Sequence, residues 1–142
     1  MKGVRHLADN RRRLLFVKKF FEEYTDEDHG ATMYDIQHYL KRCGIEAERK
    51  SITEDIYALQ DYGMDIFWEE NEKQRRLRER DFELSELKMI IDCVASSKML
   101  SEARSKELIE KLGKLTSVYE RRTLERRVMV SGRAKTTNRM TM

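Results

Sequence analysis

Apolar residues recur at helical spacing over most of the chain, and the polar segments between them mark where helices begin and end. The first stripe predicts a helix that begins near Asp9 or Asn10 and ends near Tyr24. Its buried face is expected to contain Leu14, Leu15, Val17, Phe20, Phe21 and Tyr24. The polar residues that follow should end this helix.

Two shorter helices are predicted next, joined by a turn at Gly44. Thr32 and Asp35 have the spacing of a capping box, which predicts the start of a helix that ends at Gly44. A further stripe predicts a helix over about residues 49–62, stopped by Gly63. Two short helices with glycine at the corner, the second opening with Arg, Lys and Ser, are typical of a helix-turn-helix.

After Gly63 the spacing of the apolar residues changes from helical to alternating. Residues 64–68 alternate and residues 75–82 can return as a second strand, which predicts a hairpin, or wing. Two more helices should follow, one capped by Ser85 and ending near residues 99–100, and one capped by Ser101. The last helix carries a wide apolar stripe that needs a partner surface. We expect this stripe to pair two copies of the chain through Leu108, Leu112, Leu115 and Tyr119.

These elements predict a mainly α protein. Residues 1–82 are interpreted as a winged helix-turn-helix with a short β-hairpin wing, residues 83–127 as a helical linker that dimerises, and residues 128–142 as a short strand and polar tail. The composition agrees, because 39% charged and 39% hydrophobic residues, without proline, are typical of amphipathic helices. The net charge is only +3, but residues 1–24 hold seven Lys or Arg against three acids.

The helix at about residues 49–62 is the predicted DNA-reading element. Major-groove edges and phosphates offer mostly acceptors, so such a helix needs donors on its first turn. Arg49 can reach guanine or a phosphate, Lys50 a phosphate, and Ser51 or Thr53 a base or the backbone. Tyr57 either touches the DNA backbone or packs inside the domain. The alternative for Arg49 and Lys50 is an ordinary solvated helix start.

Further basic residues are candidates for phosphate contacts. The wing carries Lys73, Arg75, Arg76 and Arg78. Glu69, Glu70 and Glu72 lie beside them, so an exposed turn with local ion pairs is the alternative. Arg11, Arg12 and Arg13 oppose the dipole of the first helix, which costs roughly 0.3–1 kcal/mol per charge unless phosphate is near.

Other functions find little support in the sequence. There is no glycine-rich phosphate loop, no catalytic Cys/His spacing and no apolar carboxylate dyad, so we expect neither enzyme nor cofactor. Cys43 and Cys93 share no metal-ligand motif with the three histidines, and we expect both to be buried thiols in a reducing cytoplasm. No apolar run is long enough for a membrane helix, and the charged start does not have the pattern of a signal peptide.

Residues 32–66 carry a family resemblance. TMYDIQHYLKRCGIEA and the following ERKSITEDIYALQDYGMDI resemble the N-terminal winged helix-turn-helix of bacterial WYL-domain transcriptional regulators. Residues 78–117 are similar to the helical linker of that family, and residues 126–138 to the stretch that leads into its effector domain. The chain stops at Met142, where the ligand-sensing WYL domain would begin.

The resemblance implies a dimeric regulator of transcription whose helix-turn-helix binds operator DNA. Arg49, Lys50, Ser51 and Thr53 match the start of the recognition helix, and Asp55, Ile56 and Leu59 match its structural frame. Glu54 is a departure, because many members have Arg there. We therefore expect a homodimeric repressor that binds double-stranded DNA. The alternative is an interaction module that pairs with a partner such as a full-length regulator and inhibits it.

Overall fold

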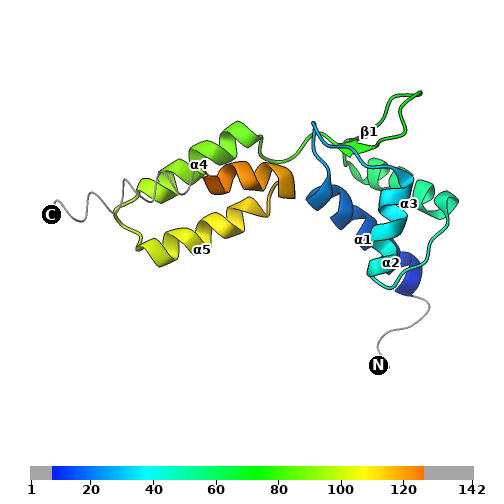
Figure 1. The fold of residues 1–142 in the computed structure, drawn as a ribbon, viewed down its shortest axis with the longest axis horizontal. Helices are drawn as coiled ribbons and strands as arrows, with labels where there is room; N and C mark the ends of the chain where they lie inside the picture. Colours follow the sequence, from blue (N-terminus) through cyan, green and yellow to red (C-terminus); the bar gives the residue numbers. More distant parts are fainter. Residues whose placement is uncertain (1–7, 127–142) are drawn as a thin grey trace. The chain divides into compact units, whose positions relative to one another are not determined.

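A computed structural model describes residues 8–126 and is mainly helical, with one two-stranded antiparallel hairpin (Figure 1). Its elements are α1 (Ala8–Tyr24), α2 (Met33–Arg42), α3 (Arg49–Tyr62), β1 (Ile66–Phe67), β2 (Arg76–Leu77), α4 (Leu84–Ser96) and α5 (Glu102–Gly113). Residues 118–126 are helical as well. The chain divides into two compact units between Glu79 and Arg80, close to the boundary expected after residue 82. The strand and tail expected at 128–142 lie outside the described residues.

The N-terminal unit is built around contacts of α1 with α2, α3 and β2. Its fully buried apolar side chains come from all three helices and comprise Val17, Phe21, Ile36, Leu40, Ile52 and Ile56, each 0% exposed. Leu15, which was expected in this core, is instead 65% exposed. It precedes Val17 by two residues and therefore lies on the opposite side of a helix with 3.6 residues per turn.

Local signals determine where α2 and α3 begin and end. The capping box of α2 is confirmed, since the Asp35 amide donates to the Thr32 hydroxyl (3.2 Å) and the Thr32 amide donates to the Asp35 carboxylate (2.8 Å). The predicted bounds of α3 are confirmed too, and Gly63 ends it at a φ of +119°. Gly44 turns the chain between the two helices at a φ of +81°, a region that favours glycine.

Removing this cap should have a measurable cost. We expect Thr32→Ala to lower the free energy of unfolding by about 1 kcal/mol, because the Asp35 amide loses its acceptor. Thr32→Ser keeps the hydroxyl and should retain most of that stability. Urea denaturation of both variants measures the difference, and equal losses would contradict the cap's contribution.

The hairpin is shorter than predicted, because β1 and β2 pair only Ile66 with Leu77 and Phe67 with Arg76. Arg75 instead exchanges backbone hydrogen bonds with Ala31, in the segment that leads into α2 (2.8 Å in both directions). The bridge between Arg75 and Ala31 therefore joins the hairpin to the segment that leads into α2.

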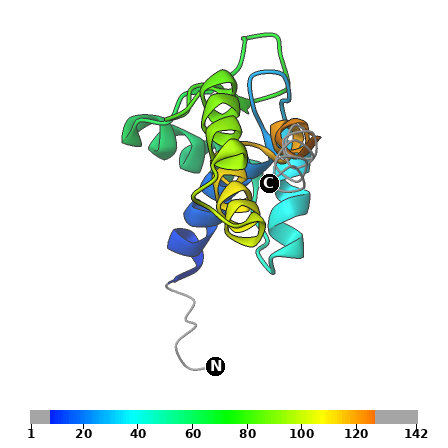
Figure 2. The same ribbon diagram turned by 90° about the vertical axis from the view of Figure 1, so that its left-hand side faces the viewer.

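In the C-terminal unit, α4 and α5 lie side by side (Figures 1 and 2). The core consists of Leu87, Ile91, Ala95, Ile109 and Leu124. The start of α4 was predicted slightly wrongly, because Glu83 rather than Ser85 is the N-cap and its amide donates to Glu86 (2.9 Å). The helix also ends earlier than expected, at Ser96.

The apolar stripe expected on one last helix is interrupted: Leu108 and Leu112 lie on α5, Leu115 lies in the turn after it, and Tyr119 lies in the helical segment 118–126. α5 ends at Gly113, and Arg121 of the segment 118–126 donates from Nε to the Gly113 carbonyl (2.8 Å). A Cβ on Gly113 would lie 3.0 Å from Arg121 Cγ, so glycine allows this close approach. Ile109, an apolar residue of the same stripe on α5, is buried in the core with residues of α4. The unit itself therefore supplies part of the partner surface that the stripe needs.

Candidate nucleic-acid interface

The first turn of α3 presents two cations to solvent. Arg49 and Lys50 are both exposed, and no acid lies in this turn. Among the described residues 8–126, neither side chain forms a hydrogen bond or an ion pair. The N-cap residue Glu48 makes no side-chain cap, so the amides at this end also lack a side-chain acceptor. Unpaired cations and helix N-terminal amides together favour an anionic partner.

The other predicted contacts on α3 differ in what they can offer. The Thr53 hydroxyl donates to the Arg49 carbonyl (2.9 Å), so its proton is already used. Ser51 is half-buried. Tyr57 is 55% exposed, and its ring centroid lies 6.3 Å from that of Trp68. The Tyr57 side chain therefore lies on the surface of α3, next to Trp68, which follows β1.

An ion pair with α1 holds α3 in place. Arg13 donates to both carboxylate oxygens of Asp55, from Nε at 2.6 Å and from Nη2 at 3.1 Å. Both side chains are largely buried, and the hydrogen bond to Asp55 raises the pKa of Arg13. The pair lies beside Ile52 and Ile56, which anchor α3 in the core. The orientation of the first turn of α3 therefore depends on α1.

The N-terminal arginines thus differ in their partners. Arg12 donates to the Cys43 carbonyl at the end of α2 (3.0 Å) and lies over the Phe16 ring. Arg11 is exposed, with no partner within residues 8–126. Acceptors of the chain itself therefore compensate the unfavourable placement of Arg12 and Arg13, without any need for phosphate. The resemblance placed Asp55 in the structural frame of the helix, but its ion pair with Arg13 was not predicted, although a carboxylate within an apolar stripe signals a buried partner.

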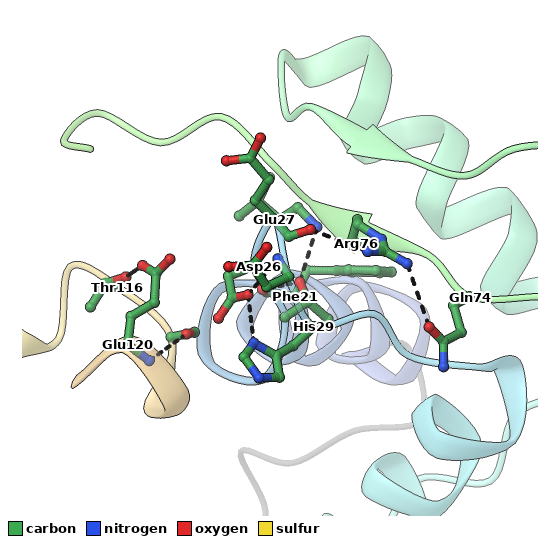
Figure 3. Close-up of polar contacts among 12 residues, drawn as sticks. Phe21, Asp26, Glu27, His29, Gln74, Arg76, Thr116 and Glu120 are labelled. Atoms are coloured by element: carbon green, nitrogen blue, oxygen red, sulfur yellow. Dashed lines mark hydrogen bonds and ion pairs between the residues drawn. The ribbon is translucent and has the colours of Figure 1, made fainter. Parts of the chain in front are cut away.

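The hairpin arginines also divide into paired and unpaired groups. Arg76 donates to Glu72 (2.6 Å), Gln74 (3.4 Å) and the Glu27 carbonyl (3.1 Å), and Figure 3 shows its contacts with Gln74 and Glu27. Arg78 is paired with Asp65 through two hydrogen bonds of 3.1 Å. Arg76 and Arg78 therefore form local ion pairs, which was the alternative to phosphate contacts. Glu72 is one of the acids predicted for these pairs, whereas Asp65, the partner of Arg78, is not.

The remaining two cations of the hairpin have no such partner in the described part of the chain. Lys73 is exposed. The Arg75 guanidinium lies 4.8 Å from the Trp68 ring centroid and makes no side-chain hydrogen bond there. Arg49, Lys50, Lys73, Arg75 and Arg11 are therefore the predicted cations that are available for a partner.

Residues 8–126 contain neither a candidate metal site nor a candidate membrane-spanning helix. They hold no cluster of three or more His, Cys, Asp or Glu suited to a metal ion. Over the same residues, no helix combines the length and hydrophobicity that crossing a bilayer requires. Cys43 and Cys93 are free thiols, but the expectation that both are buried is wrong, because Cys43 is half-buried and Cys93 is exposed.

Comparisons of the chain with protein-family models, with curated proteins and with solved structures found no match.

Proposed function

We propose that this chain is a DNA-binding transcriptional regulator that resembles the WYL-domain regulators and docks on duplex DNA as a winged helix-turn-helix. In this proposal α3 enters the major groove, whose width of about 12 Å admits a helix. The observation that carries it is that Arg49 and Lys50, at the uncapped start of α3, are exposed and have no ion-pair or hydrogen-bond partner for their side chains in the described part of the chain. Both cations are then available to phosphates or to guanine.

The charges along α3 favour an approach through its first turn. Glu54 and Asp61 are exposed further along the helix, and acids near phosphates lower affinity. An end-on approach brings Arg49 and Lys50 to the DNA and keeps Asp61, about three turns away, more distant. The hairpin between β1 and β2 then serves as the wing beside α3.

Two copies of the chain would make the operator pseudo-palindromic. The C-terminal unit would pair them through exposed apolar residues, with half-sites about 10 bp apart or a multiple of that. Leu108, Leu115 and Tyr119 are 39%, 44% and 38% exposed and remain candidates for this contact. Leu112 is half-buried against its own core, so we expect it to contribute less. Such a dimer would repress by occupying the operator.

The salt dependence of DNA binding tests the proposal. Wild-type affinity for the upstream DNA of its own gene should fall linearly as log affinity against log salt, with a slope of about 0.9 per phosphate neutralised. We expect Arg49→Gln and Lys50→Gln each to weaken binding roughly tenfold and to reduce the slope. Lys98→Gln, in the exposed loop before α5, is the matched control and should bind like wild type. A flat salt response of the wild type would refute DNA binding.

A second candidate is a protein-interaction module that pairs with, and inhibits, a full-length regulator. The exposed Leu108 and Leu115 of the C-terminal unit favour it. Leu115→Glu should then abolish capture of that regulator, whereas Arg49→Gln should leave it intact. If Leu115→Glu retains the partner and Arg49→Gln loses DNA, the interaction module is refuted.

A further inference from the structure

The hairpin contains two arginines that each lie over an aromatic ring, and their surroundings differ in one respect. Arg78 lies 3.9 Å from the Phe67 ring centroid and is paired with the Asp65 carboxylate. Arg75 lies 4.8 Å from the Trp68 ring centroid and has no carboxylate partner among the described residues. Only Arg75 therefore combines a stacked guanidinium with an unused hydrogen-bonding capacity.

Arg75 is also partly withdrawn from water. Its Nε is buried and has no hydrogen-bond partner within residues 8–126, as is also true of Arg76 Nε, and burial lowers the pKa of the Arg75 side chain. Burying a charged donor without an acceptor costs free energy. An external anion that accepts from the other nitrogens of this guanidinium would stabilise its charge and offset part of that cost.

The position of Arg75 is determined by contacts on several sides. Its backbone is bonded in both directions to Ala31, and its guanidinium lies against Trp68. The Trp68 ring in turn neighbours Tyr57, an exposed residue on α3. The guanidinium is therefore held beside the helix that we propose to enter the groove, rather than extended on a flexible side chain.

We propose that Arg75, held over Trp68, binds a phosphate group of the DNA backbone next to α3. This inference rests on the proposed function and adds Trp68 as a positioning residue. A guanidinium presents planar donors that match phosphate oxygens, and stacking on an aromatic face restricts its orientation before binding. Arg76 and Arg78 are excluded from this role, because Glu72 and Asp65 already occupy their guanidinium groups.

Paired variants test the role of Arg75 through the salt dependence of binding to a labelled duplex, followed by anisotropy. Arg75→Gln should reduce the slope of log affinity against log salt by about 0.9, the value for one phosphate. Arg78→Gln, which removes the other ring-stacked arginine, should leave the slope unchanged. An unchanged slope in Arg75→Gln, or an equal reduction in Arg78→Gln, would overturn the inference.

The role of Trp68 is tested by conservative rescue. Trp68→Leu should reduce the slope as Arg75→Gln does, and adding Arg75→Gln to it should cause no further reduction. Trp68→Phe retains an aromatic face and should restore most of the wild-type slope. Equal losses in the Leu and Phe variants would overturn positioning by the ring. If Trp68→Leu fails to fold, as judged by circular dichroism, the comparison of Trp68→Phe with Arg75→Gln still decides.

The source of the phosphate is distinguished by fluorescence, because Trp68 is the only tryptophan in the chain. Duplex DNA should change the Trp68 emission of the wild type, and inorganic phosphate at the same phosphate concentration should not. An equal change with inorganic phosphate would overturn the assignment to the DNA backbone. Failure of the proposed function is a separate result: the wild type would then bind no duplex, whereas failure of this inference leaves wild-type binding intact.

Discussion

Replacing Ile56 by alanine is expected to lower the free energy of unfolding of the N-terminal unit by about 3 kcal/mol. Ile56 lies on α3, is 0% exposed and packs in the core with residues of α1 and α2. The truncation removes buried methyl groups and leaves a cavity that the surrounding helices can fill only in part. Because α3 also carries Arg49 and Lys50, the loss of stability should weaken DNA binding near the unfolding transition.

Ile91→Ala is the matched control, since Ile91 is equally buried but lies on α4 in the C-terminal unit. Trp68 emission reports unfolding of the N-terminal unit, whereas far-ultraviolet circular dichroism reports both units. We expect Ile56→Ala to shift the Trp68 transition to lower urea and Ile91→Ala to leave it near the wild-type midpoint. An equal shift in both variants would show that the two units unfold together.

Arg13→Ala is the second substitution with a large expected effect. It leaves the Asp55 carboxylate buried without its two hydrogen bonds from the guanidinium. Removing one partner of a buried ion pair costs about 3 kcal/mol, because the remaining charge is poorly solvated. Urea denaturation measures this loss, and we expect Asp55→Ala to cost less, since Arg13 can extend toward water.

Replacing both partners by apolar residues tests the ion pair separately from the packing around it. Arg13→Met combined with Asp55→Leu should recover most of the loss, because an apolar pair of similar volume needs no solvation. Lys18 and Glu22 on α1 are the comparison, as a partly exposed pair that should contribute at most about 0.5 kcal/mol. Equal effects at the two pairs would contradict a special contribution of the buried one.

The elements of the N-terminal unit were predictable because their signals are local. The Thr32 capping box and the glycines at positions 44 and 63 act within four residues of the helix ends, so α2 and α3 follow from short stretches of sequence. The cap of α4 was misplaced for a related reason. Ser85 is a favoured cap residue, but Glu83 and Glu86 form the reciprocal contact that starts this helix.

Apolar periodicity alone was insufficient in the C-terminal unit. The pattern from Leu108 to Tyr119 is compatible with one helix, yet the chain turns after Gly113. The turn depends on Arg121, which bonds the Gly113 carbonyl from the following segment. The stripe was therefore assigned to one helix face, although Leu115 lies in the turn and Tyr119 in the helical segment that follows it.

By itself, the sequence determined the helical class of the molecule, the bounds of α3 and the placing of two cations on its first turn. Only the tertiary structure decided which of the many arginines remain available for a partner. Arg13 is paired with Asp55, 42 residues away, while Arg75 lies over an aromatic ring and has no carboxylate partner within residues 8–126. Helix ends follow from bonds between near neighbours in the chain, whereas ion pairs depend on which distant segments the fold brings together.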